Sequence, residues 1–206
     1  GVQTCALPIY LPHAVFDGTP SNPTEATVRA AVAAYQAADC DGLVAVGGGS
    51  SIDLAKGVAI AATHPGPLKT YATIEGGSPR ITERVAPLIA MPTTAGTGSE
   101  VARGAILIVD DGRKLGFHNW ALLPKAAICD PELTLALPTH LTAATGMDAL
   151  TPVLLEALAA GRIPVVSPLA AGPLNVNADE MAAALPWLAQ QLDRDGGASS
   201  RCEPAR

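Results

Sequence analysis

Residues 47–56 read GGGSSIDLAK, and the elements on either side of them indicate the class of fold. It follows a short apolar run, residues 43–46, and precedes an alanine-rich segment with helical spacing, residues 54–62. This order predicts a strand, a glycine turn and a helix. Three glycines let a ligand approach the main chain, and the start of the helix would offer unpaired N–H groups to a phosphate. Ser50 and Asp53 also have the spacing of a capping box, so the turn is interpreted either as a phosphate site or as a plain tight turn.

Length and composition allow one large folded domain or one and a half ordinary ones. The 206 residues are 49% hydrophobic and 16% charged, so we expect little disorder over most of the chain. A net charge of −6 without a basic cluster argues against a nucleic-acid partner. We expect neither a membrane-spanning helix nor a signal peptide, and therefore a cytoplasmic protein with no membrane partner. Reduced thiols, rather than disulfides or a zinc site, are predicted for the widely spaced Cys5, Cys40, Cys129 and Cys202.

Alternating apolar runs and turns predict an α/β fold with parallel strands. A helix is expected from a cap at Thr24 or Asn22 to about Ala38, and a second one over residues 142–160. Residues 64–84 are expected to form a surface loop with one helical turn. Strands are predicted at residues 14–16, 43–46, 85–91 and 105–109, with a hairpin turn at 110–112 leading into 114–117 and a short run at 126–129.

A second loop of small and hydroxyl residues, PTTAGTGSEV at 92–101, follows the strand predicted at 85–91. With this loop, the sequence resembles the iron-containing (type III) alcohol dehydrogenases, whose relatives include maleylacetate reductases and glycerol dehydrogenase-like enzymes. The resemblance covers about residues 14–151. It is carried by residues 17–18, 21–24, 40–42, 47–56, 92–101 and 130–150, the last including most of LTAATGMDALT at 141–151.

The resemblance implies a Rossmann-like parallel sheet with flanking helices over residues 14–130, which binds NAD or NADP. Residues 131–151 would begin an all-helical metal-binding domain, before the rest of which the chain is truncated. The implied reaction is hydride transfer between the nicotinamide and a small-molecule alcohol or aldehyde.

The resemblance also implies the cofactor-binding residues. Gly48, Gly49 and Ser50, within the same motif as Asp53, would face the pyrophosphate. Thr93, Thr94 and Thr97 would contact the cofactor from the second loop, Asn22 would lie near the adenosine end, and Lys114 near the ribose. The alternative is that the threonines cap turns and that Lys114 is a solvated hairpin residue.

Asp148 corresponds to the family's first ligand for a divalent metal, Fe or Zn. The family places a histidine four residues later, one helical turn on, but this chain has Pro152 there. All four histidines (His13, His64, His118 and His140) precede Asp148. One carboxylate does not hold such an ion tightly, so we expect the metal centre to be absent or crippled and the protein to be an inactive fragment.

Both ends of the chain depart from the family. Residues 1–13 are expected to be appended or disordered, in place of the family's first strand and acidic turn. An exposed sheet edge and an uncovered apolar helix suggest association, as a homodimer, or aggregation. Residues 152–192 predict a non-family helix, strand and helix, residues 193–206 predict disorder, and the tail 151–186 resembles acetylglutamate kinase of the amino-acid kinase family. That resemblance implies Asn175, Asn177 and Asp179 near an acyl-amino acid, whereas ordinary helix caps explain Asn177 and Asp179 equally well. A non-catalytic chimera joined near Thr151 is the alternative function.

Overall fold

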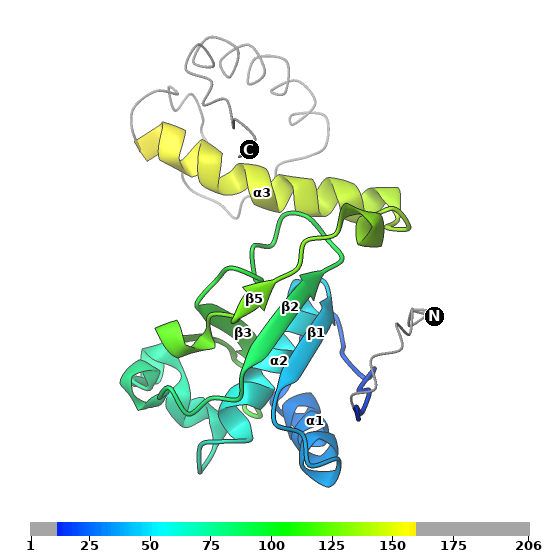
Figure 1. The fold of residues 1–206 in the computed structure, drawn as a ribbon. Helices are drawn as coiled ribbons and strands as arrows, with labels where there is room; N and C mark the ends of the chain where they lie inside the picture. Colours follow the sequence, from blue (N-terminus) through cyan, green and yellow to red (C-terminus); the bar gives the residue numbers. More distant parts are fainter. Residues whose placement is uncertain (1–11, 160–206) are drawn as a thin grey trace, which may run out of the picture. The chain divides into compact units, whose positions relative to one another are not determined.

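The computed structural model describes residues 12–159. Three strands form a parallel sheet in the order β1 (Leu43–Gly47), β2 (Leu88–Pro92) and β5 (Ala126–Ala127) (Figure 1). β1 and β2 pair in register over their whole length, with Leu43 opposite Leu88 and Gly47 opposite Pro92. The two strands therefore end at the same edge of the sheet, and the two predicted glycine/hydroxyl loops leave from that edge. The predicted α/β class with a parallel sheet and flanking helices is confirmed.

Helix α1 (Glu25–Ala37) begins where its sequence carries a cap. The Thr24 side chain accepts a hydrogen bond from the Thr27 N–H at 3.1 Å, which satisfies one of the free donors of the first turn. Val28 and Ala31 lie on its buried face, one helical turn apart. The predicted helix from Thr24 to about Ala38 is thus confirmed to within a residue.

Helix α2 (Gly49–Ala61) is the central element of the described residues. It contacts β1, β2, α1 and also β3 (Gly104–Ile108), the first strand of an antiparallel hairpin with β4 (Lys114–His118). Because several elements cover it, residues 56–60 are buried without interruption. The main apolar core gathers Val28, Leu54, Val58, Ile60, Leu107 and Phe117, among others, around this helix.

The remaining elements are short turns and one long helix. The segment between α2 and β2 holds three 3₁₀ turns where one helical turn was predicted: η1 (Leu68–Tyr71), η2 (Thr73–Glu75) and η3 (Ser78–Arg80). Two further 3₁₀ turns, η4 (Trp120–Leu122) and η5 (Pro131–Thr134), flank β5. Helix α3 (Thr139–Ala159) begins three residues earlier than predicted and continues across Thr151.

One predicted strand is wrong. Residues 14–16 form no strand, and Val15 and Phe16 are exposed. Three apolar residues can supply a strand only where a neighbouring strand pairs with them, and none of the described strands pairs with this segment. The predictions for residues 1–11 and 160–206, including the kinase-like tail and its terminal disorder, lie outside the described residues.

Candidate dinucleotide site

The first turn of α2 supplies main-chain donors. Gly47 has φ +148°, a conformation that favours glycine, and an added Cβ would collide with the Ser51 side chain. Gly48 is the N-cap, and its carbonyl accepts from the Ser51 and Ile52 N–H groups at 3.0 and 3.3 Å. The N–H groups that come before these have no acceptor within the helix, and they lie at the positive end of its dipole. This turn therefore suits an anion.

The second loop lies directly against that turn. The Thr93 N–H donates to the Gly47 carbonyl at 3.0 Å. A Cβ added to Gly48 would lie 3.3 Å from Thr94 Oγ1, and one added to Gly49 would lie 3.1 Å from the Thr97 Cβ. Thr94 Oγ1 is buried and has no hydrogen-bond partner among the described residues. The structure thus brings five predicted site residues, Gly48, Gly49, Thr93, Thr94 and Thr97, to one place.

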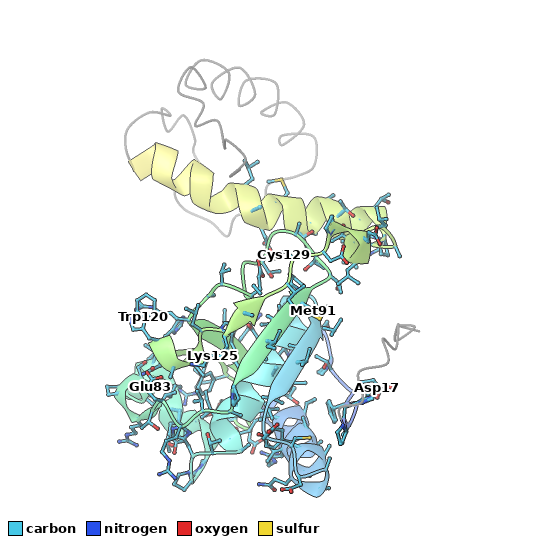
Figure 2. The ribbon with its side chains drawn as sticks, in the orientation of Figure 1. Asp17, Glu83, Met91, Trp120, Lys125 and Cys129 are labelled. Atoms are coloured by element: carbon cyan, nitrogen blue, oxygen red, sulfur yellow. The ribbon has the colours of Figure 1, made fainter. Side chains whose placement is uncertain are left out.

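Figure 2 helps to locate this edge of the sheet. It labels Met91, which lies on β2 just before the second loop, and Cys129, which lies just beyond β5. Both the loop after β1 and the loop after β2 begin at this end of the strands. Ligands bind at the carboxyl ends of the strands in open parallel sheets of this kind.

Ser50, Asn22 and Lys114 form a second group of predicted residues. The Ser50 hydroxyl donates to the Ser21 carbonyl at 2.6 Å, so it ties the start of α2 to the loop before α1. Next to Ser21, the Asn22 side chain accepts from Lys114 Nζ at 3.0 Å. Asn22 and Lys114 are both exposed. The hydrogen bond therefore pairs a loop residue with the first residue of β4.

The capping-box interpretation of Ser50 and Asp53 is wrong. Because α2 already begins at Gly49, Ser50 lies inside its first turn, and its hydroxyl bonds Ser21 instead. Asp53 Oδ2 accepts from the Ile106 N–H on β3 at 3.0 Å. Burial raises the pKa of Asp53, while the Ile106 hydrogen bond and the nearby Lys56 charge act in the opposite direction. The cofactor-binding role predicted for Asp53 stays a prediction.

Sequence reasoning missed Lys56. Its side chain is fully buried, and its Nζ donates to the carbonyls of Ser99, Ala102 and Gly104 at 2.7, 2.7 and 2.8 Å. Burial lowers the pKa of this ammonium to about 8, against the raising effect of Asp53 and Glu100. The available signal was a lysine directly before the apolar run Gly57–Ile60. A lysine buried with such a run needs polar partners, because charged side chains are almost never fully buried unless paired.

The residues around Asp148 do not fit a divalent metal site. Asp148 is exposed on α3, and position 152 of the same helix is a proline. No group of three or more His, Cys, Asp or Glu side chains with suitable geometry occurs within residues 12–159. First-row metal sites in proteins take three or four such ligands.

The predictions about cysteines and membrane-spanning helices can be checked within residues 12–159. Cys40 and Cys129 are free thiols, as expected from their spacing. No helix in this part of the chain has both the length and the apolar character needed to cross a bilayer.

Comparison with known proteins places this arrangement in a family. The family model for iron-containing alcohol dehydrogenases matches residues 8–131. 4-Hydroxybutyrate dehydrogenase of Cupriavidus necator is 79% identical over 137 residues, which are 66% of this chain and 36% of that protein. 1,3-Propanediol dehydrogenase of Klebsiella pneumoniae is 46% identical over 139 residues, 67% of this chain and 35% of that protein.

Solved structures agree. A 1,3-propanediol oxidoreductase matches with a TM-score of 0.63 and 43% identity, over 68% of this chain and 36% of its own. A sulfoacetaldehyde reductase from Bifidobacterium kashiwanohense in complex with NAD⁺ matches with a TM-score of 0.62 and 36% identity, over 67% and 36%. This chain thus spans just over a third of the length of these relatives. Because the family model matches more than half of its residues, the chain belongs to the iron-containing alcohol dehydrogenases.

Proposed function

We propose that this chain is the nucleotide-binding part of an NAD(P)-linked alcohol dehydrogenase, and that it binds the cofactor's diphosphate where the loops after β1 and β2 meet. The observation that carries the proposal is the close approach of Thr94 and Thr97 to Gly48 and Gly49, where an added Cβ would lie 3.3 and 3.1 Å from these threonines. This approach occurs at the carboxyl ends of two neighbouring parallel strands. The match to a relative in complex with NAD⁺ supports it.

Each part of the site has a separate task in this proposal. The N–H groups of the first turn of α2 would bind phosphate oxygens, and the glycines would let the phosphates approach the main chain. The unpartnered hydroxyl of Thr94 would donate to the same group. Lys114, held by Asn22, would place a positive charge near the cofactor's ribose. When bound, the nicotinamide supplies the hydride chemistry of alcohol and aldehyde interconversion.

The substrate class to test for this chain comes from its relatives. The names of the relatives point to short alcohols such as 4-hydroxybutyrate and 1,3-propanediol as the class to test. Because the residues around Asp148 do not fit a metal site, we expect this chain to bind cofactor without turnover.

Calorimetric titration of the full chain with NADH and NADPH tests the proposal, with Gly49→Ala as the key variant. Its new Cβ would lie within 3.2 Å of three Thr97 atoms and would obstruct the approach to the main chain, so we expect an affinity loss of about tenfold. Gly146→Ala is the matched control, because a Cβ there meets nothing within 4 Å. If the unaltered chain binds neither cofactor at millimolar concentration, the proposal is wrong.

A further inference from the structure

The buried Lys56 anchors one end of the second loop. Its three carbonyl partners run from the last part of that loop to the first residue of β3: Ser99, Ala102 and Gly104. An ammonium group has three N–H donors, and here each has an acceptor. The buried ammonium is therefore compensated by three main-chain carbonyls, and these hydrogen bonds fix where residues 99–104 lie against α2.

Asp53 extends this attachment. It precedes Lys56 by three residues on α2, so both side chains lie on the same helix face. Asp53 accepts from the Ile106 N–H, while Lys56 donates to three carbonyls. One helix face thus holds four main-chain groups of residues 99–106 through groups of opposite charge. We call this pair of side chains the α2 clamp.

The second loop is attached to the rest of the fold at both of its ends. Its first end is tied to β1 by the hydrogen bond from the Thr93 N–H to the Gly47 carbonyl, and its last end is tied by the α2 clamp. Between them, Gly96 and Gly98 have φ of +141° and +64°, and residues 93–100 form no helix or strand. Glycines raise the entropic cost of ordering a loop, so fixed ends matter more here than in a regular element.

We propose that Lys56 and Asp53 are positioning residues, which hold Thr94 and Thr97 against the first turn of α2 and so shape the cofactor site. This inference rests on the proposed dinucleotide site for its effect on affinity, but not for its effect on loop order. An apolar side chain would fill the same space without the cost of burying a charge, so packing alone does not account for a lysine. What the charge adds is a defined position for three carbonyls.

Two measurements on the full chain test the clamp, with Lys56→Met as the key variant. Lys69→Met is the matched control, because Lys69 Nζ pairs at the surface with Asp111 and not with residues 93–106. In Lys56→Met we expect faster hydrogen exchange at residues 93–106, unchanged exchange in α1, and an NADH affinity about tenfold weaker. Lys69→Met should change neither. Unchanged exchange at residues 93–106 in Lys56→Met would overturn the clamp whether or not cofactor binds.

The pH dependence of binding separates positioning from simple packing. In the unaltered chain, NADH affinity should fall as pH rises through about 8, because deprotonated Lys56 leaves one of its three carbonyls without a donor. The charged groups that face Lys56 are Asp53 on α2, Glu100 on the connecting segment and Lys125 before β5. The two carboxylates and Lys125 are shared by both proteins. Lys56→Met should therefore show no such fall, and an equal fall in both would contradict the proposal.

A second variant covers the case in which Lys56→Met does not fold. Asp53→Ala removes the acceptor for Ile106, whereas Asp53→Asn keeps an oxygen there. In Asp53→Ala we expect faster hydrogen exchange at residues 93–106 and weaker NADH binding. In Asp53→Asn, exchange and affinity should return most of the way to those of the unaltered chain. Equal behaviour of the two variants would overturn the role of Asp53. If the unaltered chain binds no NADH while the exchange results hold, the proposed function fails and the clamp stands.

Discussion

At the scale of single residues, the buried ammonium of Lys56 makes stability depend on pH in a defined direction. Burial lowers its pKa from 10.5 to about 8 in the folded chain. Between these values the unfolded chain binds more protons than the folded chain, so the free energy of unfolding should rise with pH over this window. Below about pH 8 the ammonium is charged in both states, so the cost of burying its charge is fully present and does not change with pH.

Urea unfolding of the unaltered chain and of Lys56→Met at pH 7.5 and 9.5 checks this sign. The difference in unfolding free energy, unaltered chain minus variant, should increase with pH, because other titrating groups are shared and cancel. NADH affinity should move the other way over the same range, since it depends on the loop's third hydrogen bond. A difference that shrinks with pH would show that Lys56 does not carry the shifted pKa.

The site residues divide according to the signal that each one leaves in the sequence. Gly48, Gly49, Thr94 and Thr97 were predictable as neighbours, because loops that follow adjacent parallel strands must meet at one edge. The attachment of Lys56 and Asp53 to residues 99–106 was not predictable. Their partners are main-chain groups of a distant segment, and main-chain groups leave no signature in the sequence. The capping-box error has a related origin: a glycine N-cap makes no side-chain hydrogen bond, so the capping-box pattern favoured Ser50 instead of Gly48.

At the scale of elements, Gly57 shows how closely α2 is packed. A Cβ added there would lie 2.8 Å from Leu107 Cδ1 and 2.9 Å from Val28 Cγ2. Alanine in place of glycine inside a helix favours folding by about 1 kcal/mol. Overpacking a filled core costs about 1–3 kcal/mol, and here two neighbouring side chains would have to move. We therefore expect Gly57→Ala to lower the unfolding free energy by about 1 kcal/mol, as measured by urea denaturation.

Gly146→Ala on α3 is the matched control for that prediction. The substitution is the same and also lies inside a helix, but a Cβ there meets nothing within 4 Å. Only the helix-propensity term remains, so this variant should be more stable by up to about 1 kcal/mol. If both variants shift the unfolding free energy in the same direction, the packing of α2 against β3 and α1 leaves room for the added methyl group, and the prediction for Gly57→Ala is wrong.

The elements themselves differ in how far local sequence specifies them. The start of α1 was predicted because Thr24 caps it with its own side chain, which is a local interaction. The strand predicted at residues 14–16 failed because a strand also needs a partner, which a local apolar run does not supply. The three 3₁₀ turns between α2 and β2 were missed because such turns are short and carry no period.

At the scale of the whole molecule, the proposed cofactor site is not accompanied by a set of metal ligands within residues 12–159. His64 Nε2 lies 3.0 Å from the Thr82 hydroxyl, and His118 Nδ1 lies 2.9 Å from the Thr73 hydroxyl. Both rings are thus engaged by threonines. His140 precedes Asp148 by two helical turns on the same helix and is exposed. Within residues 12–159 these groups do not form a set of three ligands.

Adding Fe²⁺ or Zn²⁺ to the chain should therefore produce no alcohol oxidation, because a lone exposed carboxylate binds such an ion weakly. The measurement is NADH formation with 4-hydroxybutyrate or 1,3-propanediol, in parallel with calorimetric titration of NADH. Asp148→Asn is the matched variant, and it should leave NADH affinity unchanged with or without metal, because Asp148 is not part of the proposed cofactor site. Metal-dependent NADH formation that disappears in Asp148→Asn would mean that Asp148 recruits ligands beyond the described residues. Retained NADH binding without turnover would separate cofactor binding from metal-dependent catalysis, because the dinucleotide-binding site would then form without the metal centre.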